Sequence, residues 1–85
     1  MPSKTVTVGS AVGLHARPAA LIAEAAGELD DDVFIGLEGK DPVDAGSALM
    51  IMTLGAKHGD TVEVSGEQQS DVDTIAAMVE KDLDA

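Results

Sequence analysis

The sequence predicts an α+β protein in which an antiparallel β-sheet carries helices on one of its faces. Short runs of alternating apolar and polar residues predict strands, and longer stretches with apolar residues at helical spacing predict helices. These elements follow one another in the order β-α-β-β-α-β-α, and each offers one apolar face that must be covered. The 85 residues, 45% of them hydrophobic, predict one small domain over residues 1–85 with a single thin core.

The first strand and the first helix are predicted from the N-terminal third of the chain. Residues 4–8 alternate Thr and Val, which places Val6 and Val8 on one face of a half-buried strand. Across residues 16–28, small and apolar side chains recur at helical spacing, and alanine, the best helix former, is abundant. Gly27 is a stop signal near the end of this helix.

Two strands are predicted to follow this helix. Val33, Ile35 and Leu37 share one face of an alternating run, which predicts the second strand. A turn then leads into the short segment 41–44, which predicts the third strand. Pro42 has no N–H to donate to a neighbouring strand, so this third strand is expected at an edge of the sheet.

The second half of the chain predicts two helices with a strand between them. Residues 47–54 form a short apolar helix that Gly55 closes, and residues 60–65 alternate as the fourth strand. Ser70 or Asp71 is expected to cap the last helix. The apolar stripe of that helix consists of Val72, Ile75, Ala76, Val79 and Leu83.

Composition excludes several classes of function. A net charge of −11 repels nucleic acid and anionic membranes. The chain has no cysteine and only two well-separated histidines, so neither a disulfide framework, nor a metal site, nor a cofactor is predicted. No N-terminal apolar run resembles a signal peptide, and no stretch reaches the roughly 20 apolar residues that span a bilayer. We therefore expect a cytoplasmic protein.

The excess of 16 acidic over 5 basic residues also indicates the solvent for which the surface is suited. At 1 M salt the Debye length is about 3 Å, so self-repulsion that weakens such a fold in dilute buffer is screened. The acidic residues are spread among apolar positions that can form a core, which argues against disorder. The composition predicts a halophilic protein, and an ordinary acidic protein is the alternative.

The stretch Gly13–Ala20, which reads GLHARPAA, places a histidine at the start of the first predicted helix. His15 falls at or near the N-cap, and Arg17 follows two residues later. A helix start offers backbone N–H donors and the positive end of the macrodipole, and a guanidinium can bind phosphate oxygens in pairs. Pro18 suits the first helical turn. This pattern favours phosphoryl chemistry, although a histidine without chemical function at a helix start fits the same residues equally well.

A second motif, SALMIMTLG at residues 47–55, follows in mid-chain. Together with the first motif, and in its length and motif order, the chain resembles the HPr family of phosphocarriers in the phosphoenolpyruvate-dependent sugar phosphotransferase system. The resemblance extends over essentially all 85 residues. It implies an open-faced two-layer sandwich with strand order 1-4-2-3, in which the third strand lies at an edge.

The resemblance also implies a function. A phosphoryl group passes from phosphorylated enzyme I to Nδ1 of His15 and then to the A component of a sugar-specific permease. Arg17 and the N–H groups of Ala16 and Arg17 stabilise its charge, and Pro18 marks the helix start. On this interpretation the protein is a stoichiometric carrier without a cofactor, is not an enzyme, and is expected to be a monomer.

Further positions acquire roles from the same resemblance. Ala20, Ala48, Leu49 and Met52 match an apolar docking patch, whereas plain core packing is the alternative; Leu49 and Met52 are the expected exposed pair. Ser47 matches a serine that a regulatory kinase phosphorylates in some Gram-positive relatives, and a simple helix N-cap is the favoured alternative.

One position departs from the family pattern. Val12 stands where relatives commonly have a polar Ser or Asn, so the hydrogen bond of that side chain is missing unless Ser10 replaces it. The second histidine, His58, lies in a predicted turn, where we expect it to be solvated and without a role.

Three other functions stay open at this stage. A nitrogen-regulatory carrier has the same His15 chemistry with other partners. A regulatory binding module acts through Ser47, although such relatives usually lack the active histidine. An enzyme that hydrolyses small phosphate esters needs a water-activating group near His15, and the motif itself contains no carboxylate.

Overall fold

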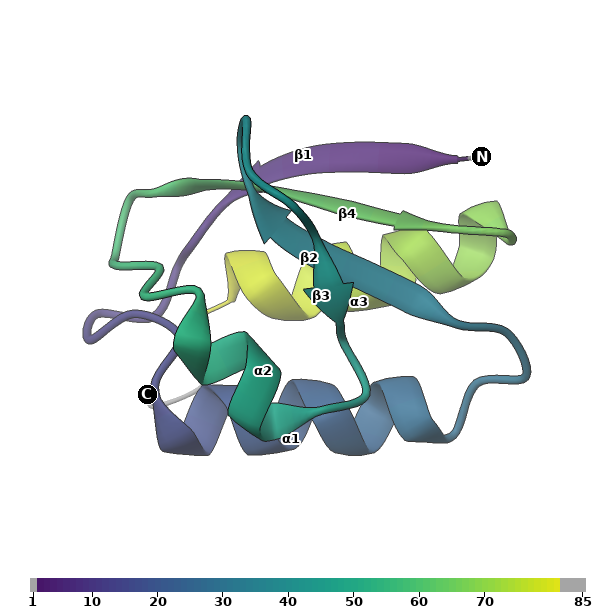
Figure 1. The fold of residues 1–85 in the computed structure, drawn as a ribbon, viewed down its shortest axis with the longest axis horizontal. Coiled ribbons are helices and arrows are strands. Elements are labelled where there is room, and N and C mark those ends of the chain that lie inside the picture. Colours follow the sequence, from purple (N-terminus) through teal and green to yellow (C-terminus); the bar gives the residue numbers. More distant parts are fainter. Residues whose placement is uncertain (1, 82–85) are drawn as a thin grey trace.

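The computed structural model describes residues 2–81, and the predicted elements occur there in the predicted order (Figure 1). Apart from α3, each element begins and ends within two residues of its expected bounds. The elements are β1 Ser3–Thr7, α1 Ala16–Gly27, β2 Val33–Leu37, β3 Val43–Asp44, α2 Ala48–Thr53, β4 Thr61–Gly66 and α3 Gln69–Glu80. No helix within this part of the chain is long and apolar enough to cross a membrane.

The four strands form one antiparallel sheet in the order β1-β4-β2-β3, as the resemblance implies. Val62 pairs with Val6 on one side of β4, and Val64 pairs with Ile35 on the other. Because side chains alternate along a strand, these residues all lie on the same face of the sheet. The segment that contains Pro42 leads into the edge strand β3, which confirms the placement expected from its missing N–H donor.

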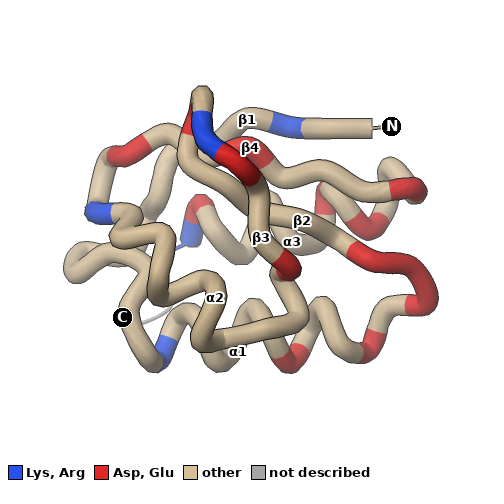
Figure 2. The backbone as a smooth tube through the Cα atoms, in the orientation of Figure 1, with Lys and Arg blue, Asp and Glu red and all other residues tan. Residues whose placement is uncertain are grey.

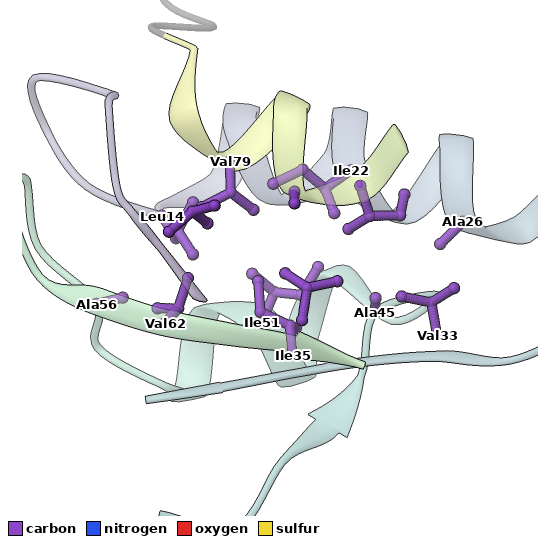
Figure 3. Close-up of a cluster of buried hydrophobic side chains, with 14 of the residues drawn as sticks. Leu14, Ile22, Ala26, Val33, Ile35, Ala45, Ile51, Ala56, Val62 and Val79 are labelled. Carbon is purple, nitrogen blue, oxygen red and sulfur yellow. The ribbon is translucent and has the colours of Figure 1, made fainter. Parts of the chain in front are cut away.

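The helices cover this apolar face. Figure 1 shows them on one side of the sheet, where α3 contacts β1, β4 and β2, and α1 contacts both α2 and α3. In Figure 3, Ile22 and Val79 point from the helices toward Ile35 and Val62 of the sheet. All four side chains are fully buried. The core is therefore a single layer between the sheet and the helices.

The opposite face of the sheet is polar. Thr5 and Glu63 pair across β1 and β4, and both are exposed. On β4, Ser65 belongs to the same face and is only half-buried. This face needs no covering layer, which makes the architecture an open-faced two-layer sandwich.

The two helix ends that the sequence marks with glycine differ from each other. Gly55 follows α2 with a φ of +66°, the left-handed conformation that closes helices. Gly27 instead remains the last helical residue of α1, and the cap residue Glu28 keeps a right-handed φ of −87°. α1 therefore ends at Gly27, as the sequence predicts, but without left-handed geometry at its end.

The expected cap of α3 is wrong. The N-cap is Gln68, which makes no side-chain cap bond, and the Val72 N–H donates to its carbonyl at 3.1 Å. Ser70 and Asp71 both lie inside the first turn. The helix starts early because it follows directly on β4, and Val72 packs against the Gly66 backbone at the end of that strand. Leu83 of the predicted apolar stripe lies outside the described residues.

We expect the two serines to respond differently to replacement by alanine. The Ser47 Oγ accepts the Met50 N–H at 3.3 Å, so Ser47→Ala should lower the free energy of unfolding by about 1 kcal/mol. Ser70→Ala is the matched control and should be neutral or slightly stabilising, because alanine is the better helix former inside a turn. Urea unfolding of both variants measures this. Equal losses in the free energy of unfolding for the two variants would show that Ser70 caps α3.

Candidate functional site

The His15 side chain is exposed at the start of α1. His15 is the N-cap of this helix, with φ −90° and ψ −164°, and its imidazole makes no cap hydrogen bond. Its carbonyl accepts the Ala19 N–H at 2.9 Å, which begins the helical hydrogen bonding. The imidazole therefore lies at the positive end of a helix of 12 residues and is reachable from solvent.

The first turn of α1 offers donors to an anion at this place. Helical bonding starts with the Ala19 N–H, so the N–H groups of Ala16 and Arg17 have no acceptor within the helix. Pro18 has no N–H and is buried, which anchors the turn in the core. The Arg17 side chain is exposed. The sequence motif thus becomes a cluster of two backbone donors, a guanidinium and an imidazole.

The loop before His15 is held by backbone hydrogen bonds at both ends. The Gly9 N–H donates to the Val79 carbonyl at 3.0 Å, and the Leu14 N–H donates to the Ala56 carbonyl at 3.0 Å. Leu14 is itself buried. Gly13 has a φ of +81°, a conformation that favours glycine. The end of α3 and the segment after α2 therefore set the position of His15.

Most of the expected docking residues are exposed. Ala20 lies on α1 and is exposed, and Leu49 and Met52 on α2 are 68% and 37% exposed. Ala48 is half-buried. Since α1 packs against α2, these residues belong to two neighbouring helices. The exposure of Leu49 and Met52 is confirmed, whereas the docking role of the set stays a prediction.

Met50 was missed as an exposed residue of α2. It is 42% exposed, while Ile51 beside it is fully buried. The spacing of Ala48, Ile51 and Leu54 at i, i+3 and i+6 marks the face of α2 that packs inward, and all three are at least half-buried. This stripe was available in the sequence, and it leaves Met50 on the outer face.

The structure also brings the backbone of Lys57, a residue distant in sequence, to the loop that ends in His15. A side chain built at Gly13 would meet the Lys57 Cα at 3.0 Å, so Lys57 lies against the loop that ends in His15. The acidic run 30–32 lies in the connection between α1 and β2, coloured red in Figure 2. A helix of 12 residues is about 18 Å long, so this run is remote from His15.

Other sites are sparse. Among residues 2–81, no group of three or more His, Cys, Asp or Glu side chains is arranged to hold a metal ion. His58 is exposed in the turn before β4. The start of α1 is therefore the candidate functional site.

Comparison with known proteins agrees with the fold and with this site. The family model described as the PTS HPr component phosphorylation site matches residues 2–81. The phosphocarrier protein HPr of Streptomyces coelicolor is 32% identical over 87 residues, covering 99% of this chain and 94% of the relative. HPr of Haloferax volcanii is 42% identical over 65 residues, covering 75% and 73%. The HPr-like protein Crh of Halalkalibacterium halodurans is 33% identical, covering 96% and 100%.

Solved structures share the architecture. A phosphocarrier protein HPr from Bacillus anthracis superposes with a TM-score of 0.84 at 34% identity, covering 92% of this chain and 95% of that chain. HPr from Thermoanaerobacter tengcongensis superposes with a TM-score of 0.87 at 28% identity, covering 100% and 98%.

The fold and the site together define a small phosphoryl-carrier protein that is not itself an enzyme. The chain belongs to the HPr family of the phosphotransferase system, and it is a phosphocarrier with a phosphorylation-site histidine. The strand order 1-4-2-3 that the family resemblance implied is confirmed in this chain, and the fold is shared with HPr from Thermoanaerobacter tengcongensis.

Gly9 should prove essential for the position of the loop. A Cβ at Gly9 would lie 1.7 Å from the Glu80 carbonyl oxygen, so Gly9→Ala forces the loop away from the end of α3. We expect a loss of about 1–3 kcal/mol in the free energy of unfolding and slower phosphorylation.

Gly27→Ala is the matched control for this variant. A Cβ at Gly27 meets no atom within 4 Å and the residue is helical, so alanine should gain up to about 1 kcal/mol. Chemical denaturation of both variants decides the comparison. A Gly9→Ala protein as stable as the wild type would show that the loop is not held against α3.

Proposed function

We propose that His15 accepts the phosphoryl group from phosphorylated enzyme I at Nδ1 and delivers it to the A component of a sugar-specific permease. The observation that carries this proposal is the exposed imidazole at the start of α1, with Arg17 and two backbone donors beside it. We further propose that the protein does this as a monomer in the cytoplasm.

The transfer needs little from the carrier beyond position and charge. The lone pair of Nδ1 on a neutral imidazole attacks phosphorus while the bond from phosphorus to the donor group of enzyme I breaks. The proton on Nε2 stays in place. Arg17 and the N–H groups of Ala16 and Arg17 offset the charge of the phosphoryl oxygens. The second transfer repeats these steps in reverse toward the permease component.

The exposure of His15 and Arg17 supports reversible transfer of the phosphoryl group. A carrier must release the phosphoryl group as readily as it accepts it. His15 and Arg17 are both at the surface, where water screens the attraction between guanidinium and phosphate. The phosphoryl group is therefore stabilised without being trapped.

Partner proteins must approach the same face. We assign Ala20, Ala48, Leu49 and Met52 to the contact with enzyme I and with the permease component. The exposed apolar side chains of α2 support this assignment, since isolated Leu and Met side chains at such exposure gain from being covered.

A regulatory binding module is the second candidate, because the match to the HPr-like protein Crh extends along nearly the whole chain. Phosphorylation of Ser47 would act through the Oγ that caps α2. A nitrogen-regulatory carrier shares the His15 chemistry and differs only in its phosphoryl acceptor. The presence of His15 at the helix start supports a carrier over a purely regulatory module.

Phosphorylation from phosphoenolpyruvate with enzyme I tests the proposal. We expect wild-type protein to gain one acid-labile, base-stable phosphate, which is the behaviour of an N–P bond. His15→Ala should abolish this labelling. His58→Ala, the matched histidine control in an exposed turn, should retain it. Labelling that survives in folded His15→Ala protein would refute the assignment, and a stable Ser47 ester would favour the regulatory candidate.

We also propose that the surface is adapted to concentrated salt. Across residues 2–81 every acidic side chain is at least partly exposed, and the full chain carries 16 acidic and 5 basic residues. In dilute buffer these charges repel one another and weaken the compact state.

The midpoint of thermal unfolding should therefore rise with KCl. Each kcal/mol of relieved repulsion raises the midpoint by about 4–8 °C in a protein of this size. Most of the screening should be complete near 1 M, where the Debye length is about 3 Å. Thermal scans from dilute buffer to multimolar KCl measure the effect. A midpoint that stays flat or falls would exclude adaptation to salt.

A further inference from the structure

Val12 is an exposed apolar side chain close to the phosphorylation site. It is 63% exposed, nearly as much as Leu49 on α2. It lies three residues before His15, at the tip of the turn formed by residues 10–13. An exposed valine does not stabilise the isolated protein, because burial of an apolar side chain is favourable. The carrier function just proposed does not use this residue.

Backbone hydrogen bonds hold the turn that carries Val12. The Gly13 N–H donates to the Ser10 carbonyl at 3.0 Å, which closes the turn, and the Ser10 residue at its base is only 1% exposed. The Leu14 N–H is bound to the Ala56 carbonyl at 3.0 Å immediately afterwards. With its base in the core, the turn holds Val12 outward, three residues before His15.

A partner that reaches His15 comes close to Val12. Three residues span at most about 11 Å between Cα atoms, even when fully extended. A weak, transient protein interface buries about 600 Å² on each partner, which corresponds to a disc about 14 Å in radius. An interface of this size centred on His15 extends as far as Val12.

We propose that Val12 is a docking residue, which packs against an apolar surface of enzyme I when enzyme I transfers the phosphoryl group to His15. This inference rests on the proposed carrier function and extends the contact from α1 and α2 to the turn before α1. The partner surface must be apolar at this point, because a valine offers neither charge nor hydrogen bonds. Salt weakens an ion pair but does not weaken such an apolar contact. A contact of this kind suits a chain with a net charge of −11.

Val12→Ser tests the contact. The substitution removes apolar area, and serine is compatible with a turn. In transfer from phosphorylated enzyme I, we expect KM to rise about threefold to tenfold, with kcat within about twofold of wild type. The ratio of the KM of Val12→Ser to the KM of the wild type should be the same in dilute buffer and in multimolar KCl. Ala11→Ser, in the same turn, is the matched control and should change KM little, because alanine has less apolar area to lose.

A second measurement separates docking from a local effect on the phosphohistidine. The isolated phosphorylated proteins, with no partner present, should lose phosphate at the same rate whether residue 12 is Val or Ser. Thermal unfolding should also be unchanged, since Val12 is largely outside the core. A KM of Val12→Ser equal to that of the wild type, in dilute buffer and in multimolar KCl, would overturn the inference. A changed rate of hydrolysis with an unchanged KM would overturn it as well, and would place Val12 in the shaping of the phosphoryl site.

These outcomes are distinguishable from failure of the carrier function. If His15 is not the acceptor, labelling survives in His15→Ala protein whatever residue occupies position 12. If His15 is the acceptor and Val12 does not dock, His15→Ala loses the label and Val12→Ser transfers with wild-type KM.

Discussion

The rest of the structure depends on the need to cover one apolar face of an antiparallel sheet. Val62 and Val64 of β4 point to this face, and both are fully buried. The helices supply the covering side chains, among them Ile22 of α1 and Ile75 of α3. Once α1 and α3 lie on the same face, the start of one helix and the end of the other are brought to the loop that precedes His15. The position of the phosphorylation site is thus a consequence of how the core is closed.

The site and the core share residues, which explains how an exposed histidine can be well positioned. Val79 is a core side chain whose carbonyl also binds the Gly9 N–H, and Leu14 is a buried side chain whose N–H binds the Ala56 carbonyl. Backbone hydrogen bonds therefore hold the chain up to the residue before His15, and the imidazole extends into solvent. A carrier needs this combination, because two different proteins must reach the same ring atom in turn.

Recognition on this surface, as proposed above, combines two kinds of contact with different responses to salt. The acidic run 30–32 lies at the far end of α1, whereas Arg17 follows His15 by two residues and the backbone of Lys57 lies against Gly13. Charge contacts weaken as ionic strength rises, but apolar contacts through Leu49 or Val12 do not. A protein with this excess of acidic residues can bind its partners in concentrated salt only if contacts of the second kind dominate.

The sequence by itself determined the elements and the chemistry of the site. Strand alternation, helical spacing and the cap at Ser47 depend on residues a few positions apart, and so does the placement of His15 at a helix start. Only the tertiary structure decided what depends on distant segments. The start of α3 came ahead of its expected cap, where Val72 packs on the end of β4. Lys57 reached the loop before His15 because sheet order, not chain distance, sets which segments are neighbours.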